Sequence, residues 1–142
     1  MTKSVSEKMG IKPGSRAILI NAPAEILQAI ELPDLEFGTK LEGDFDYIHL
    51  FANSQAVLHE QLPKAKDCLK QTGALWVSWP KGNQKGTDLT LAKVIEIGYA
   101  KGLVESKCLS VDAIWSALKF TYPKEGKSYN NSYGKLQSNP SK

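Results

Sequence analysis

The sequence reads Ala17-Ile18-Leu19-Ile20-Asn21-Ala22-Pro23-Ala24-Glu25 at the point that decides the fold. The four apolar residues at its start predict a strand with no wet face, as in parallel sheets that are covered on both sides. Pro23 suits the first turn of a following helix, where its missing N–H costs no hydrogen bond. Nucleotide-binding α/β domains carry glycines in this turn, so that the backbone can approach a phosphate or a cofactor. Since this turn has none, the stretch predicts a cofactor-binding architecture whose usual contact is removed or replaced.

Strands and helices alternate along the rest of the chain, and the last two strands form a hairpin. Apolar runs predict strands, and apolar residues at helical spacing predict helices. The expected strands cover residues 16–20, 45–52, 74–79, 104–111 and 115–122, and the expected helices cover 4–9, 24–31, 54–69 and 88–101. Right-handed crossovers then place helices on both faces of the sheet. We predict an α/β fold of the three-layer, Rossmann-like kind, with a mostly parallel twisted sheet and a C-terminal antiparallel β-hairpin.

Two segments carry more specific expectations. Residues 36–41 form a weak strand, only about three residues before the strand at 45–52. Parallel neighbours need a crossover of about a dozen residues or more, so we expect 36–41 to be antiparallel or to be an extended connection along the sheet edge. Pro63 lies inside the helix predicted over 54–69, and we expect it to break or kink that helix.

Composition favours one domain. The chain has 142 residues and a net charge of +3, and we assign residues 1–122 to a single α/β domain. The segment 123–142 holds four lysines, one glutamate and little to bury, so we expect a disordered tail. Nucleic acid is not an expected partner, because no basic stripe marks a folded face.

No membrane segment is expected either. No apolar run approaches the roughly 20 residues that cross a bilayer. The N-terminus is too polar for a secretory signal. The sequence therefore predicts a cytoplasmic protein.

Three blocks, in this order, resemble class I methyltransferases. They are residues 12–20 (Lys-Pro-Gly-Ser-Arg-Ala-Ile-Leu-Ile), 45–48 (Phe-Asp-Tyr-Ile) and 69–77 (Leu-Lys-Gln-Thr-Gly-Ala-Leu-Trp-Val). These blocks look like the approach to the first strand, the start of the fourth and the approach to the fifth, and the terminal hairpin is similar to the last two strands of that family. The chain also resembles a small bacterial family of unknown function, through Trp79-Pro80-Lys81, Asp88-Leu89-Thr90, Val111-Asp112 and residues 115–120 (Trp-Ser-Ala-Leu-Lys-Phe). The resemblance implies a truncated class I methyltransferase-like Rossmann domain over residues 1–122.

The departures from the methyltransferase pattern bear on the cofactor. In that family an acidic, glycine-rich first turn lies against the methionine part of S-adenosylmethionine, and residues 21–24 keep none of it. An acidic residue after the second strand normally holds the ribose hydroxyls, and Glu42 is the only candidate. We therefore expect no cofactor and disfavour binding of S-adenosylmethionine.

Ligands of open α/β sheets lie beyond the carboxyl ends of the strands, which selects a rim of candidate residues. The candidate ligand-binding residues are Asn21, Glu25, Asn53, Trp79, Lys81, Asp88, Asp112 and Trp115. Each has a purely structural alternative: the asparagines and acids can fix turns and helix starts, the tryptophans can cover the core, and the lysine can be solvated. Lys81 opposite Asp112 would suit a small anion or an acidic side chain.

The histidines, the possible metal ligands and Lys119 do not form a recognisable catalytic or metal site in the sequence. His49 and His59 lie on different predicted elements with no nucleophile nearby, and no metal-ligand cluster is visible. Lys119 is expected well below the rim as a structural lysine, and it needs a carboxylate partner if its strand is internal. No catalytic residue emerges.

Three functions remain open at this point. The first is a non-catalytic small-ligand-binding or regulatory module on a methyltransferase-like scaffold. The second is a small transferase, dependent on S-adenosylmethionine or on another donor, with atypical cofactor binding. The third is a protein–protein interaction module. The expected partner is accordingly a small molecule or a protein, and we lean towards a protein that is not an enzyme.

Overall fold

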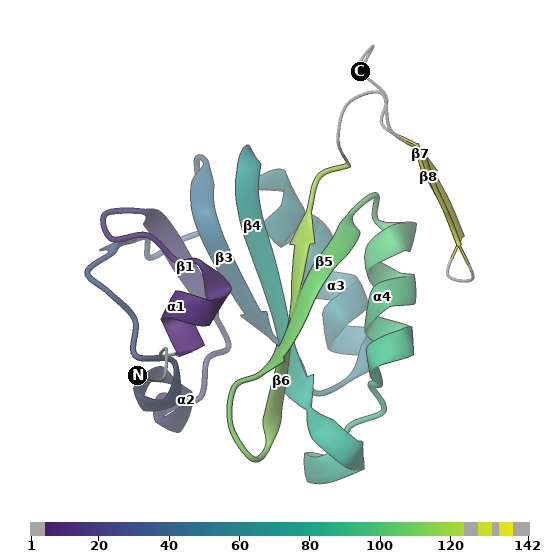
Figure 1. Cartoon of the computed structure of the whole chain (residues 1–142), viewed down its shortest axis with the longest axis horizontal. Helices are drawn as coiled ribbons and strands as arrows, with labels where there is room; N and C mark the ends of the chain where they lie inside the picture. The colour runs from purple at the N-terminus through teal and green to yellow at the C-terminus, as the bar shows by residue number, and fades with distance from the viewer. Residues whose placement is uncertain (1–4, 124–127, 132–133, 138–142) are drawn as a thin grey trace.

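The computed structural model describes residues 5–123, 128–131 and 134–137, and its main feature is a six-stranded sheet (Figure 1). The strands of this sheet are β1 (Arg16–Ile20), β2 (Glu36–Phe37), β3 (Phe45–Phe51), β4 (Leu69–Pro80), β5 (Val104–Ser110) and β6 (Trp115–Thr121). Their order is β2-β1-β3-β4-β6-β5. The first four strands in that order are parallel, and β6 runs antiparallel to both of its neighbours. The predicted fold class is confirmed.

Helices cover both faces of the sheet (Figure 1). The helices are α1 (Val5–Met9), α2 (Ala24–Ile30), α3 (Gln55–Asp67) and α4 (Leu91–Ala100), and a short 3-10 helix, η1 (Lys81–Gly86), follows β4. Helices α1 and α2 lie in front of the sheet in this view, and α3 and α4 lie behind it. The result is the expected three-layer arrangement.

The two faces of the sheet carry two separate hydrophobic clusters. Because side chains alternate along a strand, Trp76 and Val77 of β4 point to opposite sides. Trp76 packs in the cluster that contains Ile26 and Ile30 of α2. Val77 packs in the cluster that contains Leu62 of α3 and residues of α4. Helices cover less of the α1/α2 face than of the opposite face, since α1 and α2 have only five and seven residues.

The expectation for residues 36–41 is confirmed in part: the segment lies at the sheet edge and is not a neighbour of β3, but it is not antiparallel. Only Glu36 and Phe37 form a strand, and this strand is parallel to β1, with Glu36 opposite Arg16 and Phe37 opposite Ala17. The crossover that makes this possible is the α2 segment between β1 and β2. The error came from considering β3 as the partner, whereas β1 lies between β2 and β3.

Pro63 does not break α3, which is continuous from Gln55 to Asp67. Proline removes one helical hydrogen bond, to the carbonyl four residues earlier. That carbonyl belongs to His59, which lies on the exposed side of the helix, where water can bond to it instead. The helix also ends two residues earlier than predicted, because β4 already begins at Leu69.

A second, two-stranded sheet lies within the segment that we predict to be disordered. Its strands are β7 (Ser128–Asn131) and β8 (Gly134–Gln137), which pair antiparallel. No pattern in the sequence predicts this pairing. Residues 124–127, 132–133 and 138–142 lie outside the described residues, and disorder of the tail as a whole stays a prediction.

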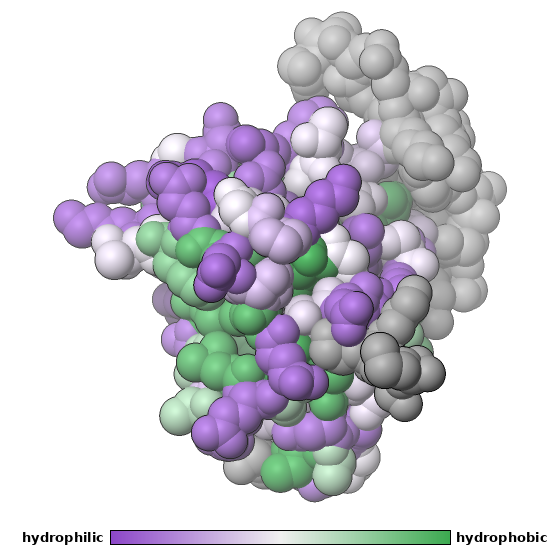
Figure 2. Space-filling view, turned by 60° about the vertical axis from the view of Figure 1, so that its left-hand side comes forward, coloured by the Kyte–Doolittle hydropathy of each residue, from purple (hydrophilic) through white to green (hydrophobic). Residues whose placement is uncertain are grey.

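The surface carries some exposed apolar side chains. Figure 2 brings the side with β1 and α2 forward and shows hydrophobic side chains gathered there between hydrophilic ones. Leu27 of α2 and Phe37 of β2 are 42% and 51% exposed. Within the part of the chain that the structure describes, no helix is long and apolar enough to cross a membrane.

A buried polar chain links the two central strands β3 and β4. The His49 imidazole lies between the Tyr47 hydroxyl (2.6 Å to Nδ1) and the Ser78 hydroxyl (2.6 Å to Nε2). A neutral imidazole donates one hydrogen bond and accepts one, so both bonds are satisfied when the ring is uncharged. Burial raises the pKa of Tyr47 and lowers that of His49 to about 3. The side chains of Tyr47, His49 and Ser78 are therefore uncharged throughout the ordinary pH range.

The lowered pKa of His49 predicts a pH-dependent stability. The unfolded chain takes up a proton on this residue below its ordinary pKa of 6.5, and the folded protein does so only near 3. As the pH is lowered from 7 to 5, the free energy of unfolding should fall by about 2 kcal/mol. Urea unfolding at the two pH values measures it. A His49→Gln variant with the same pH dependence as the wild type would contradict the assignment.

Gly98 of α4 gives a second stability prediction. A Cβ at this position would overlap the ring of Phe120 on β6. Glycine to alanine inside a helix normally stabilises by about 1 kcal/mol, whereas overpacking costs about 1–3 kcal/mol. Gly98→Ala should therefore lower the free energy of unfolding, as measured with urea. Phe120→Leu, combined with it, should recover part of that loss, and a stabilised single variant would show that α4 lies farther from the sheet.

Candidate functional site

A pocket of about 410 Å³ lies at the carboxyl ends of β1 and β3. We call it the rim pocket, and its lining residues are Asn21, Pro23, Glu25, Phe51, Ala52, Asn53, Val57 and Trp115. Its volume falls in the range of roughly 300–1,000 Å³ that is typical of small-molecule sites. Its position is the one at which open α/β sheets bind their ligands. The pocket is therefore the candidate functional site.

Four of the eight predicted site residues meet in this pocket, and they come from four different parts of the fold. Asn21 follows β1, Glu25 lies in the first turn of α2, Asn53 follows β3 and Trp115 begins β6. The strand ends bring them together, because β1 and β3 are parallel neighbours. Three of them are polar and exposed, so they can contact a ligand.

The turn after β1 keeps a glycine-like conformation without a glycine. Asn21 has a φ of 61°, in the left-handed region. Asparagine is one of the few residues other than glycine that adopts this region readily. Its side-chain amide also donates to the carbonyl of Phe51 at 3.4 Å, across the β1–β3 pair. The sharp turn that we associated with glycine is thus made by an asparagine.

Two aromatic side chains form the floor of the rim pocket. Phe51 stacks on the imidazole of His49, with 4.2 Å between ring centroids, and meets Trp115 edge to face at 5.6 Å. Through this stack, Phe51 packs directly against the hydrogen-bonded group of Tyr47, His49 and Ser78. No pattern in the sequence predicts this stack.

The indole N–H of Trp115 has no hydrogen-bond partner. Trp115 is 5% exposed, and its Nε1 is buried without an acceptor among the described residues. Buried donors are nearly always paired, so an unpaired one in a pocket wall is the group that a ligand acceptor would satisfy. This unpaired donor belongs to a residue that lines the rim pocket.

Two further candidates lie away from the pocket. Trp79 is 3% exposed and packs in the α3/α4 cluster, because its side chain points to that face of β4. The Asp88 carboxylate accepts from the backbone N–H of Gln55 at 2.8 Å, and so it fixes the start of α3. Thr90 caps α4 through the Lys93 N–H, so α4 begins after Asp88, where the predicted helix began.

Lys81 and Asp112 both hold the β5–β6 turn, without an ion pair between them. The Lys81 ammonium donates to the Ser110 hydroxyl and, at 2.6 Å, to the backbone carbonyl of Asp112. The Asp112 carboxylate accepts from the N–H groups of Ile114 (2.8 Å) and Trp115 (2.7 Å). Both side chains are thus occupied, and they position Trp115 without lining the pocket themselves.

Glu42, the candidate for holding ribose hydroxyls, lies at the wrong end of the sheet. Its backbone carbonyl accepts from the guanidinium of Arg16 at 2.9 Å. Arg16 is the first residue of β1, whereas the rim pocket lies beyond the last. Val57, on the first turn of α3, lines the pocket instead.

No metal site accompanies the pocket. Within residues 5–123, 128–131 and 134–137, no three His, Cys, Asp or Glu side chains come close enough together to hold a metal ion. Any cofactor of the rim pocket would therefore be held by the amides of Asn21 and Asn53, the carboxylate of Glu25 and the Trp115 N–H.

Several solved structures of methyltransferases are similar to this chain in fold. The ribosomal protein L11 methylase from Lactobacillus delbrueckii subsp. bulgaricus superposes with a TM-score of 0.56 and 12% identity, over 82% of this chain and 74% of that one. A TehB-like SAM-dependent methyltransferase from Corynebacterium glutamicum ATCC 13032 Kitasato gives 0.55 and 14%, over 83% and 85%. Magnesium protoporphyrin IX methyltransferase from Synechocystis PCC 6803, with bound SAH, gives 0.55 and 11%, over 82% and 78%. The fold is that of the class I methyltransferases. No family model and no curated protein matches the sequence.

These neighbours contradict the expectation that the protein has no cofactor. One of them is described as SAM-dependent and another holds SAH, so the likeness points to an S-adenosyl compound. The expectation rested on the turn without glycine. Its physical weakness is that Asn21 takes the left-handed conformation and keeps the turn sharp.

The contacts of Asp112 predict a structural effect. Asp112→Ala removes the acceptor of two backbone N–H groups and should lower the free energy of unfolding by about 1–2 kcal/mol. Urea unfolding measures it. Asp34→Ala is the matched control, because Asp34 is exposed and only its backbone carbonyl is bonded. Equal stability of the two variants would refute the role of Asp112.

Proposed function

We propose that the protein is a methyltransferase that binds S-adenosylmethionine in the rim pocket. The unpaired Trp115 N–H in the wall of a pocket at the carboxyl ends of β1 and β3 carries this proposal. The methyltransferase fold supports it, because ligands of such sheets bind at this end. The bound cofactor supplies an electrophilic methyl group on a positively charged sulfur.

The residues of the pocket suit the parts of such a ligand. Glu25 provides a negative charge for the ammonium or the sulfonium group. Phe51 and Trp115 provide an apolar, aromatic floor, and Asn21 and Asn53 provide amide donors and acceptors. Trp115 Nε1 provides a donor whose burial makes a bond to it worth more than one in water.

Two departures from the family pattern predict weak binding. The turn after β1 carries Pro23, which has no N–H to offer to a ligand. Strand β2 has two residues, and Glu42 lies far from its carboxyl end, so no acidic side chain is placed for the ribose hydroxyls. We expect a dissociation constant well above that of a ligand held by a complete set of contacts.

Ligand binding tests the proposal directly. S-adenosylmethionine and S-adenosylhomocysteine should both bind the full chain in isothermal titration calorimetry. Trp115→Phe removes the N–H and keeps the ring, and should weaken binding by about tenfold, since the donor is buried. Its melting temperature without ligand should change little, because the N–H has no partner to lose.

Trp79→Phe is the matched control, since Trp79 is equally buried but lies on the other face of the sheet. It should leave the affinity unchanged. Failure of both compounds to bind at millimolar concentration would overturn the proposal.

Transfer of a labelled methyl group to candidate acceptors then separates an enzyme from a binding module. Binding with no transfer to a protein, nucleic-acid or small-molecule extract would favour the non-catalytic interpretation. Titration calorimetry of Glu25→Gln with both compounds shows which cationic group Glu25 faces. A loss for S-adenosylmethionine alone points to the sulfonium, and an equal loss for both compounds points to the ammonium.

A further inference from the structure

The starting observation is a lysine in the middle of the sheet with no partner. Lys119 lies on β6, which is internal between β4 and β5. We expected an internal Lys119 to have a carboxylate partner. None of the described residues forms an ion pair or a hydrogen bond with its ammonium group.

A second positive charge faces Lys119 from the next strand. Lys107 of β5 is directly opposite Lys119 in the antiparallel register. Opposite residues of an antiparallel pair project from the same face, and like charges in this position are destabilising. Lys107 donates from its ammonium to the backbone carbonyl of Lys8 in α1, and it forms no ion pair with a described residue. The pair therefore leaves an uncompensated positive potential on the α1/α2 face.

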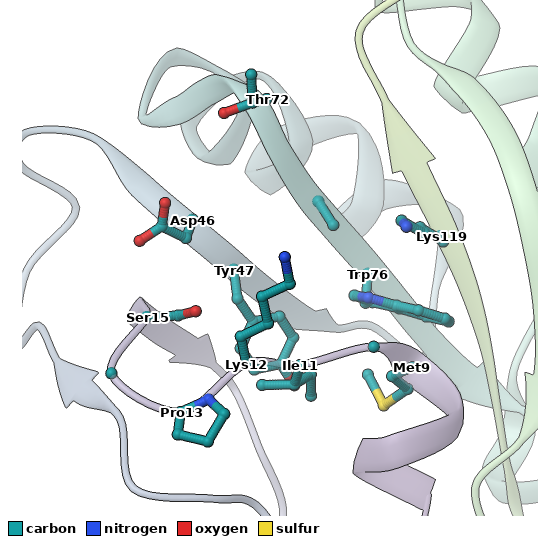
Figure 3. A pocket seen from close by; sticks show the side chains of 13 residues that line it. Met9, Ile11, Lys12, Pro13, Ser15, Asp46, Tyr47, Thr72, Trp76 and Lys119 are labelled. Atoms are coloured by element: carbon teal, nitrogen blue, oxygen red, sulfur yellow. The ribbon is translucent and has the colours of Figure 1, made fainter.

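Lys119 lines a second pocket, of about 620 Å³, at the amino ends of β3 and β4. We call it the amino-end pocket. Its floor is Tyr47 and Trp76, which are 3% and 1% exposed. The loop that joins α1 to β1 forms one wall, and Lys119 stands on the other side (Figure 3).

Lys12 adds a further cation to the same pocket. Figure 3 shows its side chain reaching from the α1–β1 loop into the space above Tyr47 and Trp76. Like Lys119, it has no ion-pair or hydrogen-bond partner for its ammonium among the described residues. Two unpaired ammonium groups thus approach one apolar floor from opposite sides.

The single carboxylate that lines the pocket is already compensated. Asp46 accepts from the backbone N–H of Arg16 at 2.9 Å and pairs with the Lys70 ammonium at 3.0 Å. These two contacts hold the pKa of Asp46 below its usual value. The charge left over in the pocket is therefore positive, and the hydroxyls of Ser15 and Thr72 add neutral hydrogen-bonding groups.

We propose that the amino-end pocket binds a small organic anion, in which a phosphate or carboxylate group is attached to a flat apolar body. The anionic group lies between Lys12 and Lys119, and the flat body contacts the half-buried Ile11 and Ala74, which lie beside the buried rings of Trp76 and Tyr47 in the pocket lining. Ammonium groups bind phosphate and carboxylate through strong charge-assisted hydrogen bonds, and the apolar side chains contribute by removing apolar surface of the ligand from water. This site is separate from the rim pocket, because it lies at the opposite ends of the same strands.

Phenyl phosphate is the probe, because it carries both parts of the ligand. Inorganic phosphate and benzyl alcohol carry one part each. Titration calorimetry of the full chain should show tighter binding of phenyl phosphate than of either fragment. Nuclear magnetic resonance should show a shift of the Trp76 indole N–H signal on binding.

Lys119→Met and Lys12→Met remove one cation each and keep an apolar stem. Each should weaken binding of phenyl phosphate by about tenfold, as for the loss of a hydrogen bond to a charged group. Lys64→Met is the matched control for net charge, because Lys64 is exposed on α3, on the other face of the sheet. It should leave the affinity unchanged.

Several results would overturn the proposal. They are no binding of phenyl phosphate at millimolar concentration, equal affinity in Lys119→Met and wild type, or an equal loss in Lys64→Met. Loss of binding in Trp115→Phe but not in Lys119→Met would place the probe in the rim pocket instead. Since Trp115 and Lys119 lie in different pockets, failure here leaves the methyltransferase proposal standing, and the reverse also holds.

Discussion

The neutral, buried imidazole of His49 is the constraint on which the centre of the molecule depends. It bonds to the Tyr47 hydroxyl through Nδ1 and to the Ser78 hydroxyl through Nε2, and it stacks on the ring of Phe51. Phe51 in turn positions Trp115 in the rim pocket. Because a charged imidazole would be buried without a counter-charge, loss of neutrality would disturb the core and the candidate site together.

The two ends of the sheet carry different chemistry on one scaffold. At the carboxyl ends, amides and one carboxylate surround an aromatic floor, which suits a ligand with a cationic part. At the amino ends, two lysines surround another aromatic floor, which suits an anion. Tyr47 and Phe51 lie on the same face of β3, four residues apart.

The turn after β1 shows how a family feature can change residue and keep geometry. The position demands a positive φ, and Asn21 meets that demand at 61°. Reading residue types alone, we inferred from the missing glycine that the cofactor contact was lost. The backbone conformation shows that the sharp turn itself is kept. Pro23 remains a real difference, because it has no N–H to offer.

The sequence by itself determined the fold class, the end of the sheet at which a ligand pocket forms and half of its candidate residues, because strand ends and helical spacing are local properties. Only the tertiary structure decided that β2 pairs with β1, that Pro63 is tolerated, that Lys81 and Asp112 hold a turn, and that Lys119 has no carboxylate partner. These outcomes depend on which side chains meet across the sheet. Such meetings join residues far apart in the chain, and no local pattern encodes them.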